Sequence, residues 1–181
     1  MTRLAVWAPS ADRVEAEVAG ERRAMEQASR PGWWQVVVPD AAHGSDYAFC
    51  IDGGDPRPDP RSTWQPEGVH GPSRVYDQSR FEWNDGRWRG VALAGAVLYE
   101  MHVGTFTTEG TFDAAIERLD HLVDVGVDVV EVLPVASYDG PHGWGYDGVA
   151  LYAVHEAYGG PDAFKRFVDA CHARNLGVVL D

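Results

Sequence analysis

The first half of the chain alternates apolar and polar residues with a period of two. Residues 14–18 and 46–51 place apolar side chains at every second position, and residues 34–38 are rich in β-forming types before Pro39. Turn signals that contain Gly, Pro or Asp separate these runs. Short strands at this spacing are typical of two packed antiparallel sheets. We therefore expect an antiparallel β-sandwich over residues 1–88.

A proline-rich segment at residues 56–73 belongs to this first region. Proline fixes φ and lacks an N–H group, so the segment is neither a helix nor a central strand. Trp64 and Val69 favour an ordered strap on the surface over a flexible linker. We therefore include this strap in the first domain.

The hydrophobic period changes to a helical one after about residue 95. Residues 96–103, 127–133 and 178–180 are interpreted as mostly apolar strands, while 112–123 and 161–171 carry apolar residues at helical spacing. Strands that alternate with helices predict a parallel sheet with right-handed crossovers. The second half is therefore expected to be an α/β unit of three strands and two helices.

The last predicted strand has no stop signal after it and runs to Asp181. A parallel strand that is buried on both faces needs a neighbour on each side. We therefore expect the front part of a larger α/β unit, with an exposed sheet edge and exposed apolar faces. A three-stranded sheet that is complete in itself is the alternative.

Charge and composition narrow the range of partners. The formal net charge of −13 argues against nucleic acid and anionic membranes. Cys50 and Cys171 are far apart in sequence and suggest neither a zinc site nor a disulfide framework, which favours the reduced thiols of a cytoplasm. The first residues lead directly into strand-like alternation, so we expect no signal peptide, and no apolar run reaches membrane-spanning length. We therefore expect a cytoplasmic protein.

The stretch at residues 143–148 carries the main candidate chemistry. Three glycines there separate Trp144, Tyr146 and Asp147. A flat apolar ring beside a charged acceptor suits a sugar, which has C–H faces and a rim of hydroxyl groups. An ordinary packed loop, in which the two aromatic rings fill a local gap, is the alternative.

Motifs along nearly the whole chain support the sugar interpretation. They lie at residues 6–9, 11–14, 58–62, 65–73, 99–107, 126–135, 145–149 and 158–161. Together they resemble the α-amylase superfamily of glycoside hydrolases and, within it, the trehalohydrolase branch. Branching and debranching enzymes share several of these motifs.

The resemblance implies a multidomain protein of the β plus α/β class. Residues 1–88 would be an immunoglobulin-like β-sandwich similar to a carbohydrate-binding module, including the strap at 56–73. Residues 95–181 would be the incomplete N-terminal part of a (β/α)8 TIM barrel, with its first three strands and two helices. Sites in such barrels gather at the C-terminal ends of the strands.

The resemblance also implies a set of substrate-binding residues. Tyr146 is expected to stack against the sugar whose bond is cleaved, with Asp147 nearby and Trp144 as part of the wall. His102 and Glu131 fall at or just beyond strand ends and are further candidates. For these two, a satisfied core histidine and a supporting hydrogen bond are the alternatives.

The resemblance implies the release of trehalose from maltooligosyl-trehalose, with this substrate or a related α-glucan as the partner and without a cofactor or a metal. A retaining glycosidase needs a nucleophile and an acid/base about 5 Å apart on either side of the bond. In the family these carboxylates come from the fourth and fifth barrel strands. We therefore expect no catalytic residue in this chain and no turnover by it alone.

Two alternative functions follow from the same sequence. The first is a stand-alone α-glucan-binding accessory module, with Trp33, Trp34 and Trp64 as its binding surface. The second is part of a glycogen branching or debranching enzyme. The sequence predicts no particular oligomeric state.

Overall fold

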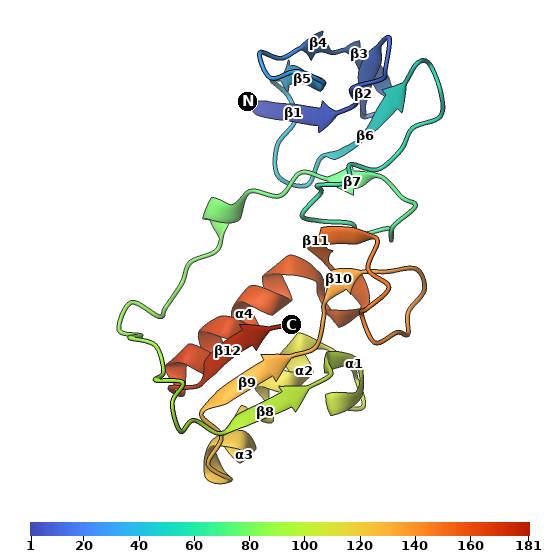
Figure 1. The fold of residues 1–181 in the computed structure, drawn as a ribbon. Coiled ribbons are helices and arrows are strands. Elements are labelled where there is room, and N and C mark those ends of the chain that lie inside the picture. Colours follow the sequence, from blue (N-terminus) through green and yellow to red (C-terminus); the bar gives the residue numbers. More distant parts are fainter.

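The computed structural model describes residues 1–181, which form two packed regions (Figure 1). An extended connector, residues 75–97, joins them. The first region contains two antiparallel sheets. One has the strand order β1-β5-β4 and the other β3-β2-β6-β7. Their strands are β1 (Thr2–Trp7), β2 (Val14–Val18), β3 (Glu21–Ala24), β4 (Glu26–Gln27), β5 (Trp33–Val38), β6 (Asp46–Ile51) and β7 (Ser73–Arg74).

The period-two pattern places the core between these two sheets. Val14, Ala16 and Val18 of β2 are buried, while the two glutamates between them are half-buried. They pack in one cluster with Trp34 and Val38 of the other sheet. The alternation predicted for residues 14–18 is therefore confirmed, because one face of the strand meets the core and the other meets water.

The proline-rich strap is ordered, and hydrogen bonds hold it against the sandwich. The Asp59 carboxylate is nearly buried and accepts from the Tyr47 hydroxyl at 2.8 Å and from the backbone N–H of Arg61 at 2.8 Å. The backbone N–H of Asp59 donates to the Ser73 hydroxyl at 2.8 Å. Gln65 is fully buried and donates to the Gly68 carbonyl. These bonds to buried groups fix a segment that proline keeps out of regular secondary structure.

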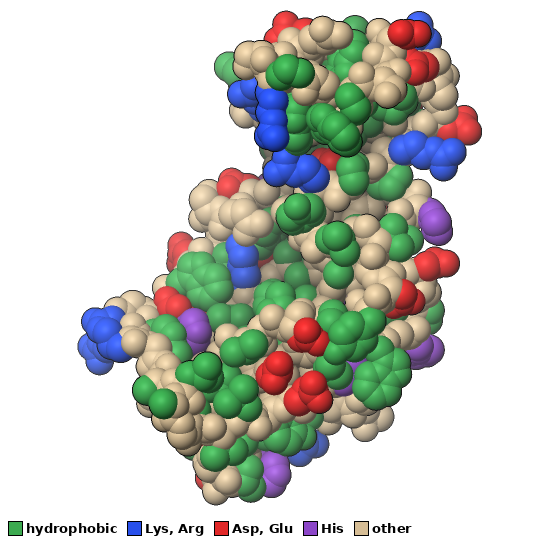
Figure 2. Space-filling model, in the orientation of Figure 1, with side chains coloured by type: hydrophobic (Ala, Val, Ile, Leu, Met, Phe, Trp, Pro, Cys, Tyr) green, Lys and Arg blue, Asp and Glu red, His purple; other side chains and the backbone are tan.

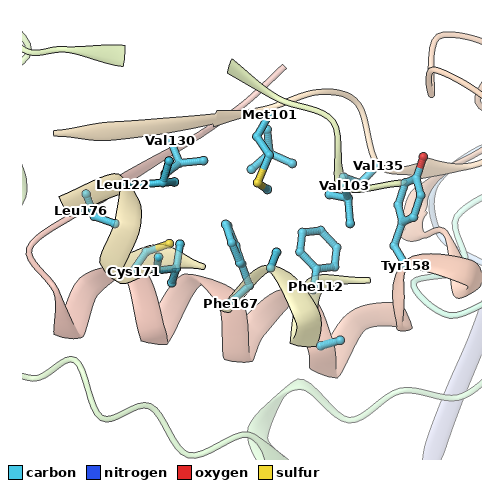
Figure 3. Packing of buried hydrophobic residues seen from close by; sticks show 14 of the residues in the cluster. Met101, Val103, Phe112, Leu122, Val130, Val135, Tyr158, Phe167, Cys171 and Leu176 are labelled. Carbon is cyan, nitrogen blue, oxygen red and sulfur yellow. The ribbon is translucent and has the colours of Figure 1, made fainter. Parts of the chain in front are cut away.

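The second region is built on a parallel sheet with the strand order β12-β9-β8. Its helices lie on one face of the sheet, where they form a single apolar core (Figure 3). A short hairpin and two 3-10 turns complete the region. The elements are η1 (Gln78–Arg80), β8 (Leu98–Met101), α1 (Val103–Phe106), α2 (Phe112–Ile116), α3 (Leu119–Asp124), β9 (Val129–Val132), β10 (Ala136–Ser137), β11 (Ala150–Val154), η2 (Glu156–Tyr158), α4 (Gly160–Ala173) and β12 (Gly177–Leu180).

The prediction of two helices is wrong in detail, because the first predicted helix is divided. Helix α2 starts after Thr111, whose hydroxyl accepts from the Ala114 N–H, and ends at Ile116. The N–H groups of Arg118 and His121 then bond to carbonyls three residues earlier, which tightens the turn and starts α3. The apolar residues of both segments still face the core. A four-residue helix, α1, also follows β8 directly and was not predicted.

The other face of the parallel sheet carries no helix. The strand register puts Leu98, Glu100, Glu131 and Val179 on this open side. Leu98 is 44% exposed and Val179 is 38% exposed. Neither β8 nor β12 has a second hydrogen-bonded neighbour in the sheet. The predicted exposed edges and apolar surface are therefore present.

The connector between the two regions is bonded along the outer side of α4. The Tyr76 hydroxyl donates to Asp162, and Asn84 donates to Asp169 from its backbone at 2.8 Å and from its side chain at 3.0 Å. Further along, His172 lies 2.8 Å from Asp85 and stacks on Trp88. Asp162, Asp169 and His172 share one stripe of the helix, so the connector follows a single helical face.

The strap makes a further contact between the regions. The indole N–H of Trp64 donates to the Glu156 carboxylate at 3.2 Å. No helix in the chain is long and apolar enough to cross a membrane.

Candidate functional site

The loop at residues 143–148 lies between strands β10 and β11, next to the open side of the parallel sheet. Gly145 has a φ of +88°, and a Cβ added there would lie 1.9 Å from the Pro134 carbonyl oxygen. A Cβ at Gly143 would lie 2.9 Å from the ring of Tyr138. Glycine at these two positions therefore lets the loop pass close to Pro134 and Tyr138, where the side chain of a larger residue would not fit.

The two aromatic residues of this loop point away from the core. Trp144 is 70% exposed and Tyr146 is 65% exposed. The Tyr146 hydroxyl donates to the Asp181 carboxylate at 2.5 Å. This hydrogen bond raises the pKa of Tyr146 to about 12, with smaller contributions from burial and from the charges of Asp181, Glu100 and Glu131. The phenol is therefore neutral over the physiological range and acts as a donor.

Three carboxylates lie near this hydroxyl on the open side. Glu100 and Glu131 are paired in register on β8 and β9, and Asp181 directly follows β12. Figure 2 shows acidic side chains gathered among hydrophobic ones on this face. None of the three forms an ion pair with Lys, Arg or His. The site is therefore anionic and rich in hydrogen-bond acceptors.

His102 follows β8 and reaches the base of the loop. Its Nε2 lies 2.8 Å from the Gly143 carbonyl oxygen and 3.2 Å from the Tyr158 hydroxyl. Its Nδ1 lies 3.1 Å from the Thr105 hydroxyl. The ring also lies 5.6 Å from the ring of Trp144. A hollow of about 370 Å³ opens beside His102 and Trp144.

Four of the five predicted site residues thus fall into two neighbouring groups. His102 and Trp144 line the hollow, while Tyr146 and Glu131 lie at the open side of the sheet. Asp147 is exposed, makes no hydrogen bond, and affects the pKa values of His155 and Tyr158 through its charge. Its carboxylate is therefore free to accept from a ligand.

Sequence reasoning missed two parts of this site. Glu100 was not among the predicted site residues, although its register with Glu131 puts it on the open side. The buried rings of Tyr138, His155 and Tyr158 beneath the loop were not predicted either. Their spacing gives no signal, because Tyr138 follows β10 whereas His155 and Tyr158 belong to the turn after β11.

A buried aromatic stack supports the loop from below. His155 is 5% exposed and stacks on Tyr138 with ring centroids 3.9 Å apart. Neither ring nitrogen of His155 has a hydrogen-bond partner. Burial lowers the pKa of His155, and the charge of Asp147 opposes this effect only in part. Burial also raises the pKa of Tyr158.

The tryptophan surface predicted for an accessory module is not formed. Trp34 is buried and donates its indole N–H to the Ala8 carbonyl at 3.1 Å. Trp33 points the other way, and the guanidinium groups of Arg30 and Arg61 lie 5.4 and 5.3 Å from the centre of its ring. Trp64 is occupied at the contact between the two regions. Neighbouring residues of a strand face opposite sides, which separates Trp33 from Trp34.

No group of three or more His, Cys, Asp or Glu side chains has a metal-binding arrangement. The site therefore offers hydrogen-bond acceptors and aromatic rings to a ligand, and it has no residues placed to hold a metal ion.

Comparison with known families decides the relationship. Residues 72–181 match the family model described as "Alpha amylase, catalytic domain". The chain belongs to the α-amylase family. Residues 1–66 match "Carbohydrate-binding module 48 (Isoamylase N-terminal domain)". A carbohydrate-binding module followed by the start of an α-amylase catalytic domain is therefore confirmed.

Individual relatives indicate which branch of the α-amylase family the chain resembles. The malto-oligosyltrehalose trehalohydrolase of Arthrobacter ramosus is 56% identical over 183 residues, which cover 99% of this chain and 32% of the relative. That of Mycobacterium tuberculosis is 51% identical and is matched over 100% of this chain and 32% of its own length. A putative α-amylase structure from Salmonella typhimurium superposes with a TM-score of 0.95 at 47% identity, covering 99% of this chain and 30% of that one.

These matches confirm the predicted resemblance to the trehalohydrolase branch of the α-amylase superfamily. The chain spans about a third of the length of the curated relatives that it matches, and corresponds to their N-terminal portion.

Replacing Gly145 tests the close passage of the loop. In Gly145→Ala, the new methyl group meets the Pro134 carbonyl, so we expect a loss of roughly 3 kcal/mol or more in urea unfolding. Gly140→Ala is the matched control, because Gly140 has a φ of +84° and no atom within 4 Å of an added Cβ. It should lose only the left-handed strain of about 1–2 kcal/mol. Equal losses in the two variants would contradict the steric argument.

The buried His155 predicts a pH dependence of stability. Its folded pKa lies below the unfolded value of about 6.5, so protonation favours the unfolded chain. The free energy of unfolding should therefore fall as pH is lowered from about 7.5 towards about 5. In His155→Phe this fall should be smaller, because the ring stack remains and the titration is removed. Exposed His142→Gln is the control. A profile for His155→Phe that is as steep as that of the unchanged chain would contradict the prediction.

Proposed function

We propose that the chain supplies the N-terminal part of an enzyme that releases trehalose from maltooligosyl-trehalose, and that its own role is to bind the glucan. The relatives at 51% and 56% identity are malto-oligosyltrehalose trehalohydrolases, which supports this substrate class. The observation that carries the proposal is the exposed pair of Trp144 and Tyr146 beside unpaired carboxylates.

In this proposal Tyr146 stacks on one sugar ring and Trp144 extends the wall. An aromatic ring packs against the C–H face of a sugar. The hydroxyl groups at the rim of the sugar need hydrogen-bond acceptors and donors. Asp147 and Glu131 provide acceptors within the same region. The Tyr146 hydroxyl gives up or shares its bond to Asp181 when a sugar hydroxyl arrives.

The same proposal assigns the two regions to domains at residues 1–88 and 95–181. The sandwich with its strap is the first domain. The sheet of β8, β9 and β12 is the first three strands of a (β/α)8 barrel, and its open side is the barrel interior. Support comes from the parallel register and from the helices that lie on one face only. A cytoplasmic location remains a prediction.

The geometry of the carboxylates argues against catalysis by this chain alone. Glu100 and Glu131 lie on neighbouring strands and point to the same side of the sheet. Neighbouring strands are about 4.8 Å apart. Both therefore approach a sugar from the same direction. A retaining mechanism instead needs carboxyl groups on opposite sides of the scissile bond.

Glucan binding by the 181-residue chain tests the proposal. We expect Tyr146→Ala to weaken the binding of maltooligosyl-trehalose about tenfold in calorimetry, because the stacking face is lost. Tyr152→Ala is the matched control, since Tyr152 is also exposed, at 61%, and does not line the hollow beside His102 and Trp144. Equal affinity in Tyr146→Ala and the unchanged chain would refute the assignment. Loss of binding in Trp33→Ala alone would favour an accessory module that binds through the sandwich.

The same chain should release no trehalose from maltooligosyl-trehalose. Product analysis by chromatography after long incubation measures this directly. Release above a blank that contains no protein would show that Glu100, Glu131, Asp147 or Asp181 can act as the reactive pair. On a chain of the relatives' full length, the same analysis separates trehalose release from branching or debranching.

A further inference from the structure

One carbonyl group at the base of the loop lies within hydrogen-bond distance of three possible donors. The Gly143 oxygen lies 2.8 Å from His102 Nε2, 3.3 Å from the Tyr158 hydroxyl and 3.5 Å from the Tyr138 hydroxyl. The two tyrosines are 2% and 1% exposed, and their hydroxyls lie 3.0 Å apart. Gly143 directly precedes Trp144. A backbone group with this many partners is fixed more firmly than one that faces water.

The His102 ring has no nitrogen left for a ligand. A proton on Nε2 lets that nitrogen donate to the Gly143 carbonyl, and Nδ1 then accepts from the Thr105 hydroxyl at 3.1 Å. A sugar hydroxyl that bonds to this ring would have to replace one of these two contacts. The arrangement therefore holds the protein backbone and leaves ligand contact to other side chains.

The surrounding residues leave just enough room for this network. A Cβ at Gly104 would lie 3.0 Å from His102 Cε1 and 3.1 Å from Tyr158 Cε1. Tyr158 also belongs to the core beneath the sheet, together with Phe112 and Phe167 (Figure 3). The position of the Gly143 carbonyl is thereby connected to the buried core of the second region.

We propose that His102 is a positioning residue, which acts with Tyr158 to hold the loop so that Trp144 and Tyr146 face the glucan before it binds. This inference rests on the proposed glucan binding and refines it. A loop that is already ordered loses less conformational entropy when a ligand arrives, so its aromatic rings bind more tightly. His102 itself makes no contact with the sugar.

Three variants of the 181-residue chain test this role. His102→Phe keeps the ring shape and removes both nitrogens. Tyr158→Phe keeps the buried ring, which is only 2% exposed, and removes its hydroxyl. His102→Gln is the conservative variant, because its side-chain amide can donate to the Gly143 carbonyl. Tyr152→Phe is the control, since the Tyr152 hydroxyl makes no hydrogen bond and the residue does not line the hollow beside His102 and Trp144.

Two measurements are made on each variant. The first is hydrogen exchange of the amides at residues 143–148 without ligand, with α4 as the internal reference. The second is the affinity for maltooligosyl-trehalose. We expect His102→Phe and Tyr158→Phe to speed exchange in the loop but not in α4, and to weaken binding by roughly three- to tenfold. His102→Gln and Tyr152→Phe should stay close to the unchanged chain in both measurements.

Other results separate the possible failures. If His102→Phe loses affinity while its loop exchange is unchanged, and Tyr158→Phe binds normally, His102 contacts the sugar directly and the inference is overturned. Unchanged exchange and affinity in both variants also overturn it. If exchange rises in both variants but the unchanged chain binds no glucan, the loop-holding role is supported and the proposed function fails.

Discussion

Helix α4 is packed on two sides, with the core of the second region on one side and the connector on the other. Its inner side places Phe167 and Cys171 in the core under the parallel sheet, where both are fully buried. Its outer side holds the connector through Asp169 and His172. Burial of the inner side gives most of the stabilisation, because bonds on an exposed face contribute only about 1 kcal/mol each. The hydrogen bonds on the outer side instead hold the connector, which leads to the sandwich region, against the helix.

The start of the same helix sets the geometry of the candidate site. The turn η2 leads into α4 and carries Tyr158, whose ring is buried in the core and whose hydroxyl lies 3.3 Å from the Gly143 carbonyl. The Gly143–Gly148 loop is therefore connected to α4 through one buried side chain. Glu156, in the same turn, accepts from Trp64 of the strap. A single turn thus links the sandwich, the core and the aromatic loop.

The sequence predicted the elements of this molecule better than their contacts. Alternation in β2 and the apolar run before Pro134 are local signals, and both gave the correct type of element. The break between α2 and α3 depends on two backbone bonds that leave the apolar spacing unchanged, so the spacing could not reveal it. The β10–β11 hairpin pairs a strand of only two residues, which is too short for a periodic signal.

The candidate site shows the same limit. Its exposed aromatic residues were found because glycines mark the loop, whereas the partner of His102 lies 41 residues away in sequence. Glu100 and Glu131 become neighbours only through the register of two strands. Alternation requires Trp33 and Trp34 to face opposite sides, but it does not say which of them is buried. Contacts of this kind depend on the packing of the whole region.

Exposing Trp144 and Tyr146 leaves apolar surface in water, so something must keep the loop from folding inward over the sheet. Tyr146 bonds to Asp181 and the Trp144 ring lies beside His102, but both side chains stay largely exposed, so the backbone must also hold the loop in place. Gly145 passes against the Pro134 carbonyl, where a side chain would not fit, and the Gly143 carbonyl is held from below by buried donors. Inward collapse would also bring apolar rings onto Glu100, Glu131 and Asp181, and removing water from these carboxylates is costly without donors to replace it. A polyhydroxyl ligand supplies both the donors and the apolar face, so it can cover this surface where the protein's own side chains cannot.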